Sequence, residues 1–175
     1  MKRCVAFLAI TSLLGWAAGA HAQATVDVGE KEKAAAKKYA EDILSAYTKS
    51  EHARFVDLVY PEVLDRVGGR DKLIALMKAV DERMQATGWS YGTATVDKPG
   101  RFARMGKVLV TTLPYTVEYV GPGTKRKDTS YLIGFSTDDG KSWKFADGRK
   151  VTRENVKDIF PNFPDSIELP RGKDK

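Results

Sequence analysis

Hydrophobic residues recur every three or four positions through the first half of the chain. Between residues 30 and 50 they form one stripe, made of Ala36, Tyr39, Ala40, Ile43, Leu44 and Tyr47. This spacing predicts an amphipathic helix with one buried face. Residues 55–67 predict a pair of short helices that meet at Tyr60-Pro61, because proline fits a first helical turn. Gly68-Gly69 then ends that pair, and Asp71 begins a helix that ends near Gly88.

The hydrophobic period changes from 3.6 to 2 after Gly88. Alternation from Trp89 to Thr95 and again over residues 108–120 predicts β-strands, followed by a strand at 129–136 and a last strand after a turn. Pro114 removes a backbone donor from the long strand, so we expect a bulge or an edge there. Counting the helix pair as one unit, the sequence predicts an α+β domain. Three N-terminal helices pack on one face of a curved antiparallel sheet of about four strands.

Residues 131–145 carry the clearest local motif. Two apolar runs flank a polar turn, which predicts a β-hairpin. The spacing Ser136-x-Asp138-x-Gly140-x-x-Trp143 resembles the Asp-box, a short hairpin motif of sialidase-like propellers. In such a box a carboxylate and a hydroxyl accept hydrogen bonds from backbone N–H groups, and glycine takes a positive φ. A propeller needs the motif in every blade. Here it occurs once, so we expect a structural clamp rather than a sugar-binding site.

The C-terminal segment from Thr152 to Leu169 alternates apolar residues with Pro161 and Pro164. Its aromatic side chains are poorly suited to a free tail in water, which predicts a short helix and a strap that pack back on the domain. We therefore expect one domain over residues 30–170 and a disordered tail at 171–175.

The N-terminus has the layout of a secretory signal peptide. Lys2 and Arg3 precede an apolar run over residues 5–18, and Ala20-His21-Ala22 provides a small-x-small cleavage site. We expect cleavage after Ala22, a short linker at residues 23–29, and a periplasmic or secreted protein. The apolar run is too short for a convincing membrane span, so no stable membrane insertion is expected after cleavage.

Cleavage removes the single cysteine, Cys4, and leaves His52 as the only histidine. The expected mature chain therefore has no thiol nucleophile, no multi-histidine metal cage and no disulfide, and we expect no metal and no cofactor. His52 is interpreted as a surface residue near a helix start. The formal net charge is +6 for the whole sequence and +4 without Lys2 and Arg3. This mild, dispersed excess does not favour a nucleic-acid partner.

In its order of elements the chain resembles the nuclear-transport-factor-2-like superfamily, which includes ketosteroid isomerases and polyketide-cyclase-like proteins. The resemblance covers residues 30–145 and depends on the helix pair at 55–69 and the curved strand meander that follows. It implies a cone-shaped, cystatin-like fold. It does not imply one function, since this fold carries enzymes, binders and scaffolds.

The resemblance implies a pocket between the concave sheet and the helices, lined mainly by apolar and aromatic groups. The candidate ligand-binding residues are Tyr60, Trp89, Tyr115 and Tyr131. Enzymes of this superfamily place an Asp or Glu in the cone to move a proton at carbon. The sequence offers Asp57 and Glu118, but neither falls in a spacing that matches a catalytic dyad. No catalytic residue is therefore assigned.

Three functions follow from these observations. The missing catalytic constellation favours a non-enzymatic exported domain that binds a small apolar ligand or a protein partner. The first alternative is a lyase, isomerase or cyclase that uses a buried carboxylate on a small hydrophobic substrate. The second is a homodimer or inhibitor-like protein whose contact is the sheet, through Val108, Val110 and Glu118 on its outer face.

Overall fold

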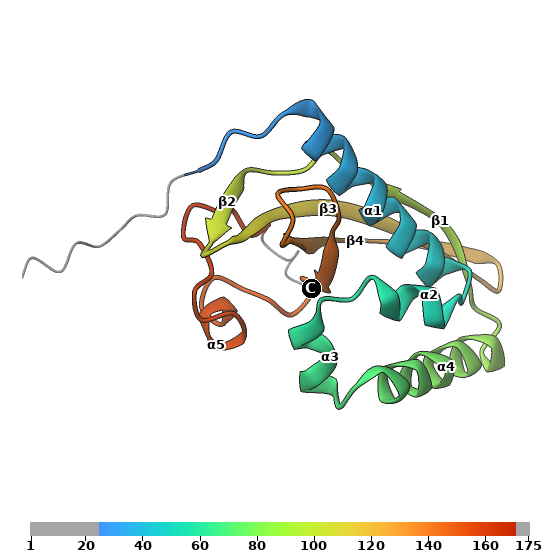
Figure 1. The fold of residues 1–175 in the computed structure, drawn as a ribbon. Helices are drawn as coiled ribbons and strands as arrows, with labels where there is room; N and C mark the ends of the chain where they lie inside the picture. Colours follow the sequence, from blue (N-terminus) through green and yellow to red (C-terminus); the bar gives the residue numbers. More distant parts are fainter. Residues whose placement is uncertain (1–24, 171–175) are drawn as a thin grey trace, which may run out of the picture.

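The computed structural model describes residues 25–170. The segments expected to be a signal peptide (1–22) and a disordered tail (171–175) lie outside them, as do the first two residues of the expected linker. The helical half contains α1 (Glu30–Thr48), α2 (His52–Asp57), α3 (Pro61–Val67) and α4 (Arg70–Ala86). The strands are β1 (Ser90–Val96), β2 (Phe102–Met105), β3 (Val108–Gly121), β4 (Thr124–Ser136) and β5 (Lys144–Asp147). A one-turn helix, α5 (Val156–Ile159), follows them (Figure 1).

The α+β class and the order of helices before an antiparallel sheet are confirmed. The helix pair is formed by α2 and α3, with Pro61 in the first turn of α3 and Gly68 in the left-handed conformation at its end. The four helices before the sheet therefore agree with the prediction, which counted α2 and α3 together as one of three helical units. The sheet has five strands in the order β1-β3-β4-β5, and β2 also pairs with β3.

Strand β3 is the centre of the sheet, and Pro114 marks the point where its neighbour changes. On one side β3 pairs with β4 along nearly its whole length. On the other side β2 pairs as far as Thr111 and β1 begins its pairing at Tyr115. Pro114 lies in the gap between them, where its carbonyl accepts a hydrogen bond from Asp97 N at 2.9 Å. The missing N–H of proline therefore costs no strand pairing, and the predicted local edge is confirmed.

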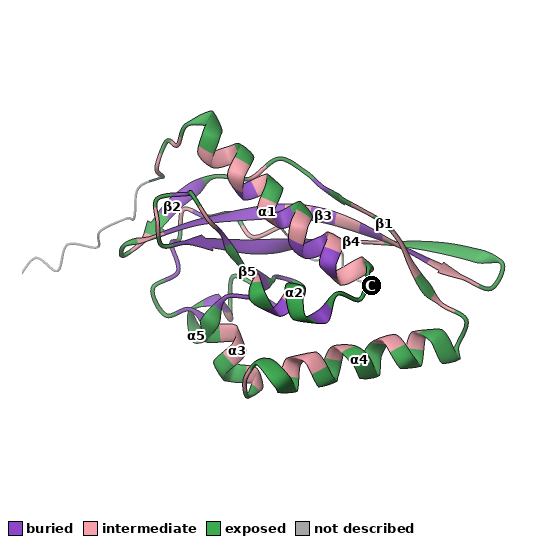
Figure 2. Ribbon diagram, turned by 45° about the vertical axis from the view of Figure 1, so that its right-hand side comes forward, coloured by how far each residue is buried: buried purple, intermediate pink, exposed green. Residues whose placement is uncertain are grey.

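Alternate residues of β3 and β4 face two separate cores. One core lies between the sheet and the helices and includes Ile43 and Leu44 of α1 with Leu113 and Tyr115 of β3. The other lies on the opposite face and includes Val110 of β3. Figure 2 shows the buried residues concentrated along β3 and β4, with α4 carrying none.

The segment after β5 covers that second face. Its buried side chains include Phe160, Phe163 and Ile167, which pack in the same cluster as Ile133 and Phe135 of β4. Phe160 lies 4.9 Å from Phe135 between ring centroids. The apolar part of the outer sheet face is therefore occupied by the chain itself, and Val110, expected at a sheet-mediated contact, is 0% exposed.

Residues 25–29, the described part of the expected linker, are packed against the domain. Val26 N donates to Phe102 O at 2.7 Å, and Thr25 bridges to Ala103 of β2. Val26 and Val28 alternate in sequence, so both side chains can turn toward the helix-side core against which they pack.

The hairpin between β4 and β5 has the hydrogen bonds of an Asp-box. Gly140 N donates to Ser136 Oγ at 2.8 Å, and Ser142 N donates to Asp138 Oδ1 at 2.9 Å. Gly140 has a φ of 88°, as expected for the glycine of this turn. Trp143 is 1% exposed and its Nε1 donates to Gly140 O at 3.0 Å. These groups serve the turn and the core, which supports a structural role.

Candidate functional site

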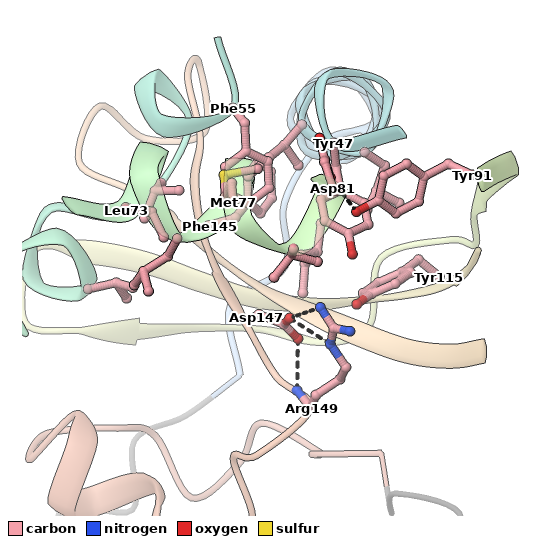
Figure 3. Close-up of a pocket in the computed structure, with 17 residues that line it drawn as sticks. Tyr47, Phe55, Leu73, Met77, Asp81, Tyr91, Tyr115, Phe145, Asp147 and Arg149 are labelled. Atoms are coloured by element: carbon pink, nitrogen blue, oxygen red, sulfur yellow. Dashed lines mark hydrogen bonds and ion pairs between the residues drawn. The ribbon is translucent and has the colours of Figure 1, made fainter. Parts of the chain in front are cut away.

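A cavity of about 370 Å³ lies between the helical layer and the helix-facing side of the sheet. It is lined by side chains from all four N-terminal helices and from β1, β3, β4 and β5. Figure 3 shows its two unlike ends. Phe55, Leu73, Met77 and Phe145 gather on one side, and Tyr47, Asp81, Tyr91, Tyr115 and Arg149 gather on the other. The cavity is thus apolar at one end and hydrogen-bonding at the other.

Helix α4 forms one wall of this cavity without being buried. Leu73, Leu76, Met77 and Val80 recur at three- and four-residue spacing, so they share the face that lines the cavity. No residue of α4 is buried, and Leu76 and Val80 are 51% and 49% exposed. An apolar helix face left this open is unusual, because such a face normally supplies most of a helix's stability.

Asp81 is the carboxylate of α4 that enters the cavity, and two other elements hold it. Its Oδ1 accepts a hydrogen bond from Tyr91 OH of β1 at 2.9 Å. Its Oδ2 lies 3.2 Å from His52 Nε2, at the start of α2. The Asp81 side chain is 14% exposed and that of His52 is 9% exposed. The interpretation of His52 as a surface residue was wrong, because α4 brings Asp81 against it.

His52 has a second neighbour on its other ring nitrogen. Nδ1 lies 2.6 Å from the backbone oxygen of Ser50. A carbonyl oxygen only accepts, so Nδ1 is the donor in this contact. Nε2 faces Oδ2 of Asp81 at 3.2 Å. Both ring nitrogens are therefore engaged within the protein, and His52 supports Asp81 from behind without lining the cavity itself.

The tyrosines beside Asp81 are neutral hydrogen-bonding groups. Burial raises the pKa of Tyr91, and its hydrogen bonds with Tyr47 and Asp81 raise that pKa further. Tyr47 and Tyr91 lie 4.7 Å apart between ring centroids, at an angle of 58°. Burial also raises the pKa of Tyr115 to about 12. The hydroxyls are thus present as O–H groups at neutral pH and can donate or accept.

A second polar pair, Asp147 and Arg149, closes the same end of the cavity. Arg149 Nε donates to Asp147 Oδ2 at 2.7 Å, and the backbone N–H of Arg149 donates to Oδ1 at 2.9 Å (Figure 3). Burial lowers the pKa of Arg149, but the hydrogen bond and the charge of Asp147 outweigh it, so this pKa is raised. Both side chains are charged, and their charges cancel.

The structure separates the four predicted ligand-binding residues. Tyr115 lines the cavity. Tyr60 stacks on Phe135 at 4.0 Å in the second core, and Tyr131 donates its hydroxyl hydrogen to Val151 O in that same core. Trp89 lines a smaller hollow beside the cavity, to which Asp81 and Tyr91 also contribute. Only Tyr115 therefore lies where the predicted pocket is.

The two carboxylates considered from the sequence lie outside the cavity lining. Asp57 is 63% exposed and pairs with Arg70. Glu118 pairs with Lys125 at 3.3 Å. The carboxylate that lines the cavity is Asp81, and one feature of the sequence indicates it. Asp81 interrupts the apolar stripe of α4 four residues after Met77 and three before Met84. A charged residue on an otherwise apolar helix face needs a partner, and His52 and Tyr91 provide two.

Residues 25–170 contain no cluster of three or more His, Cys, Asp or Glu side chains that could hold a metal ion. Within the same residues, no helix has the length and hydropathy needed to span a membrane.

No protein-family model and no curated protein sequence matches the chain. Among solved structures the chain is similar to a protein from Catenulispora acidiphila. The two share 10% identity and a TM-score of 0.45, over 67% of this chain and 91% of that one. It is also similar to an NTF2-like protein with a cystatin-like fold from Novosphingobium aromaticivorans. That match has 16% identity and a TM-score of 0.38, over 63% of this chain and 77% of that one. These likenesses concern the fold alone.

Proposed function

We propose that this chain is an exported protein that binds a small, mainly apolar molecule between α4 and the sheet. The observation that carries the proposal is the wall of α4, which presents Leu73, Leu76, Met77 and Val80 to a cavity and has no buried residue. A bound apolar molecule would cover this face and supply the contacts that α4 lacks. Export is supported by the signal-peptide pattern over residues 1–22.

The size and lining of the cavity support such a ligand. Ligand pockets usually measure about 300–1,000 Å³ and combine apolar walls with a few placed polar groups. This cavity has a volume of about 370 Å³ and such a composition. Burying the exposed halves of Leu76 and Val80 under a ligand would contribute about 1 kcal/mol each. These gains exist only in the complex, so they favour binding directly.

The proposal is tested with N-phenyl-1-naphthylamine, an uncharged apolar dye that fluoresces when it leaves water. The mature protein should bind one dye molecule, with native mass spectrometry giving the stoichiometry. Leu76→Glu places a charge in the apolar wall and should weaken binding at least fivefold. Ala75→Glu is the matched control, since Ala75 is exposed on the same helix and does not line the cavity. Equal dye affinity for both variants would reject the cavity as the site.

A second candidate function is proton transfer at carbon, as in a lyase, isomerase or cyclase. It is favoured by Asp81, a largely buried carboxylate that lines the cavity beside Tyr91. Any molecule that copurifies with the protein would be incubated with it in D₂O. Wild type should introduce deuterium at a carbon of that molecule and Asp81→Asn should not. Absence of exchange with wild type would reject this candidate.

The sheet-mediated homodimer has weaker support. Its expected contact surface included Val110, and that side chain lies under the C-terminal segment of the same chain. The uncovered remainder of this face on β3 carries Thr116, Glu118 and Val120, so a single valine is the apolar group it offers to a second copy.

A further inference from the structure

We infer that the cavity selects molecules whose polar end is uncharged, such as an alcohol or a phenol, over carboxylates and amines of the same shape. This inference concerns the ligand class and rests on the proposed binding function. It starts from the ionisable groups at the polar end. The charged or chargeable side chains that line the cavity are the three tyrosines with Asp81, Asp147 and Arg149, and His52 lies behind Asp81.

The charged groups at this end already have partners within the protein. Oδ1 of Asp81 accepts from Tyr91 OH, and Oδ2 of Asp81 faces His52 Nε2. Arg149 is paired with Asp147, with 2.6 Å between Arg149 Nη2 and Asp147 Oδ2. The hydroxyls of Tyr91 and Tyr115 keep their hydrogens at neutral pH. No unpaired charge of either sign is therefore left to balance a ligand's charge.

A charged ligand end would lose part of its hydration without gaining an unpaired opposite charge, which is unfavourable in a cavity with mainly apolar walls. An uncharged hydroxyl loses less, and here it meets both kinds of partner. The oxygens of Asp81 and of the tyrosines accept hydrogen bonds, while the tyrosine O–H groups and Arg149 donate them. Hydrogen-bonding capacity without an unpaired charge is thus the property that sets the specificity.

The size of the cavity selects the probes. A cavity of about 150 Å³ holds one benzene ring. A volume of about 370 Å³ therefore has room for two rings. We would titrate the mature protein at pH 7 with 4-phenylphenol, biphenyl-4-carboxylate and 4-phenylbenzylamine, using isothermal titration calorimetry. The phenol should bind at least tenfold more tightly than either charged probe.

A single substitution should change this preference. Asp147→Asn keeps an oxygen that can accept from Arg149 N but removes the negative charge, so the polar end gains one positive charge. The ratio of the affinity for biphenyl-4-carboxylate to that for 4-phenylphenol should then rise at least fivefold. Asp128→Asn is a matched control. Asp128 and Arg126 are also two residues apart and ion-paired, Asp128 and Asp147 are both 42% exposed, and neither Asp128 nor Arg126 lines the cavity.

The outcomes distinguish a failure of the proposed binding function from a failure of the inference on ligand class. If none of the three probes binds, the binding function is rejected and this inference with it. If they bind but a charged probe equals or exceeds 4-phenylphenol, only the inference on ligand class is overturned. If Asp147→Asn leaves the ratio of these two affinities unchanged, cancellation of charge by Asp147 is not the cause of the selectivity.

Discussion

Asp138 gives a direct test of whether the hairpin turn stabilises the domain. Its carboxylate accepts hydrogen bonds from Ser142 Oγ at 2.7 Å, Ser142 N at 2.9 Å and Ser136 Oγ at 2.8 Å. Asp138→Asn removes the charge and at least one of these acceptors while keeping the size of the side chain. Because hydrogen bonds to a charged group exceed neutral ones in strength, we expect a loss of stability at pH 7.

The pKa of Asp138 gives the expected size of this loss of stability. The Ser142 hydroxyl, helped by the Ser142 backbone N–H and by Ser136, lowers it from 3.8 to about 2. One pKa unit corresponds to about 1.4 kcal/mol, so this difference is worth roughly 2–3 kcal/mol before solvent screening. Asp138 is partly exposed, and screening reduces the expected contribution to about 1–2 kcal/mol. In a domain of this size that corresponds to a fall in Tm of roughly 2–8 °C.

The pH dependence has a defined sign. A carboxyl whose pKa is lower in the folded state stabilises the fold above its unfolded pKa and loses this contribution as pH falls toward the folded pKa. The contribution of Asp138 is therefore complete above about pH 5 and lost between about pH 4 and pH 2. Urea denaturation of wild type and Asp138→Asn at pH 6, pH 4 and pH 2.5 would measure the free energy of unfolding. The difference between the two proteins should shrink at the lowest pH.

Asp139→Asn is the control for this experiment. Asp139 is the next residue, has a φ of 58° that asparagine tolerates, and forms one exposed ion pair with Arg104. Its substitution should change stability by less than about 0.5 kcal/mol. The reasoning is refuted if both variants are equally stable at pH 6, or if the loss in Asp138→Asn does not depend on pH.

Three further predictions concern other parts of the molecule. The backbone amides of α4 should exchange hydrogen faster than those of α1, because α4 has no buried residue, and a bound dye should slow them in exchange mass spectrometry. The pKa of Tyr115 is raised to about 12 by burial, so its contribution to stability is complete below about pH 10 and lost through pH 12. Tyr115→Phe should therefore weaken the fall in stability between pH 10 and pH 12 in urea denaturation. Phe163 is 2% exposed against the second core. Phe163→Ala should cost about 3–5 kcal/mol in the same assay, and a loss below 1 kcal/mol would exclude the C-terminal segment from that core.

Most of the fold could be predicted because it follows from local spacing. The stripe of α1 is read from apolar residues three and four apart, and Ala36, Ala40 and Ile43 are indeed buried. The break between α2 and α3 is marked by Pro61. The position of Pro114 between the ends of β1 and β2 could be predicted only in part. The sequence predicts an interruption there, but only the pairing of three strands shows which neighbours are interrupted.

The cavity residues were harder to predict because they depend on register. Tyr131 pairs with Pro114, and residues paired across strands point to the same face. Tyr131 therefore lies on the face opposite to that of Tyr115, the next residue after Pro114, although both are strand aromatics in sequence. A shift of one residue in register would have exchanged them. His52 and Asp81 are 29 positions apart, and their contact follows from how α2 and α4 pack, which no local pattern states.

Helix α4 is weakly attached to the rest of the domain, so its position should depend on whether the cavity holds a ligand. With no buried apolar side chain, α4 is held partly by polar contacts, from Asp81 to His52 and Tyr91 and from Arg70 to the carbonyl of Ala53. Hydrogen bonds of this kind contribute about 1 kcal/mol each, so the position of α4 is weakly stabilised. A ligand that buries Leu76 and Val80 adds a comparable amount. Ligand binding and the closure of α4 on the sheet are therefore expected to be coupled, with the ligand completing the core on this side of the domain.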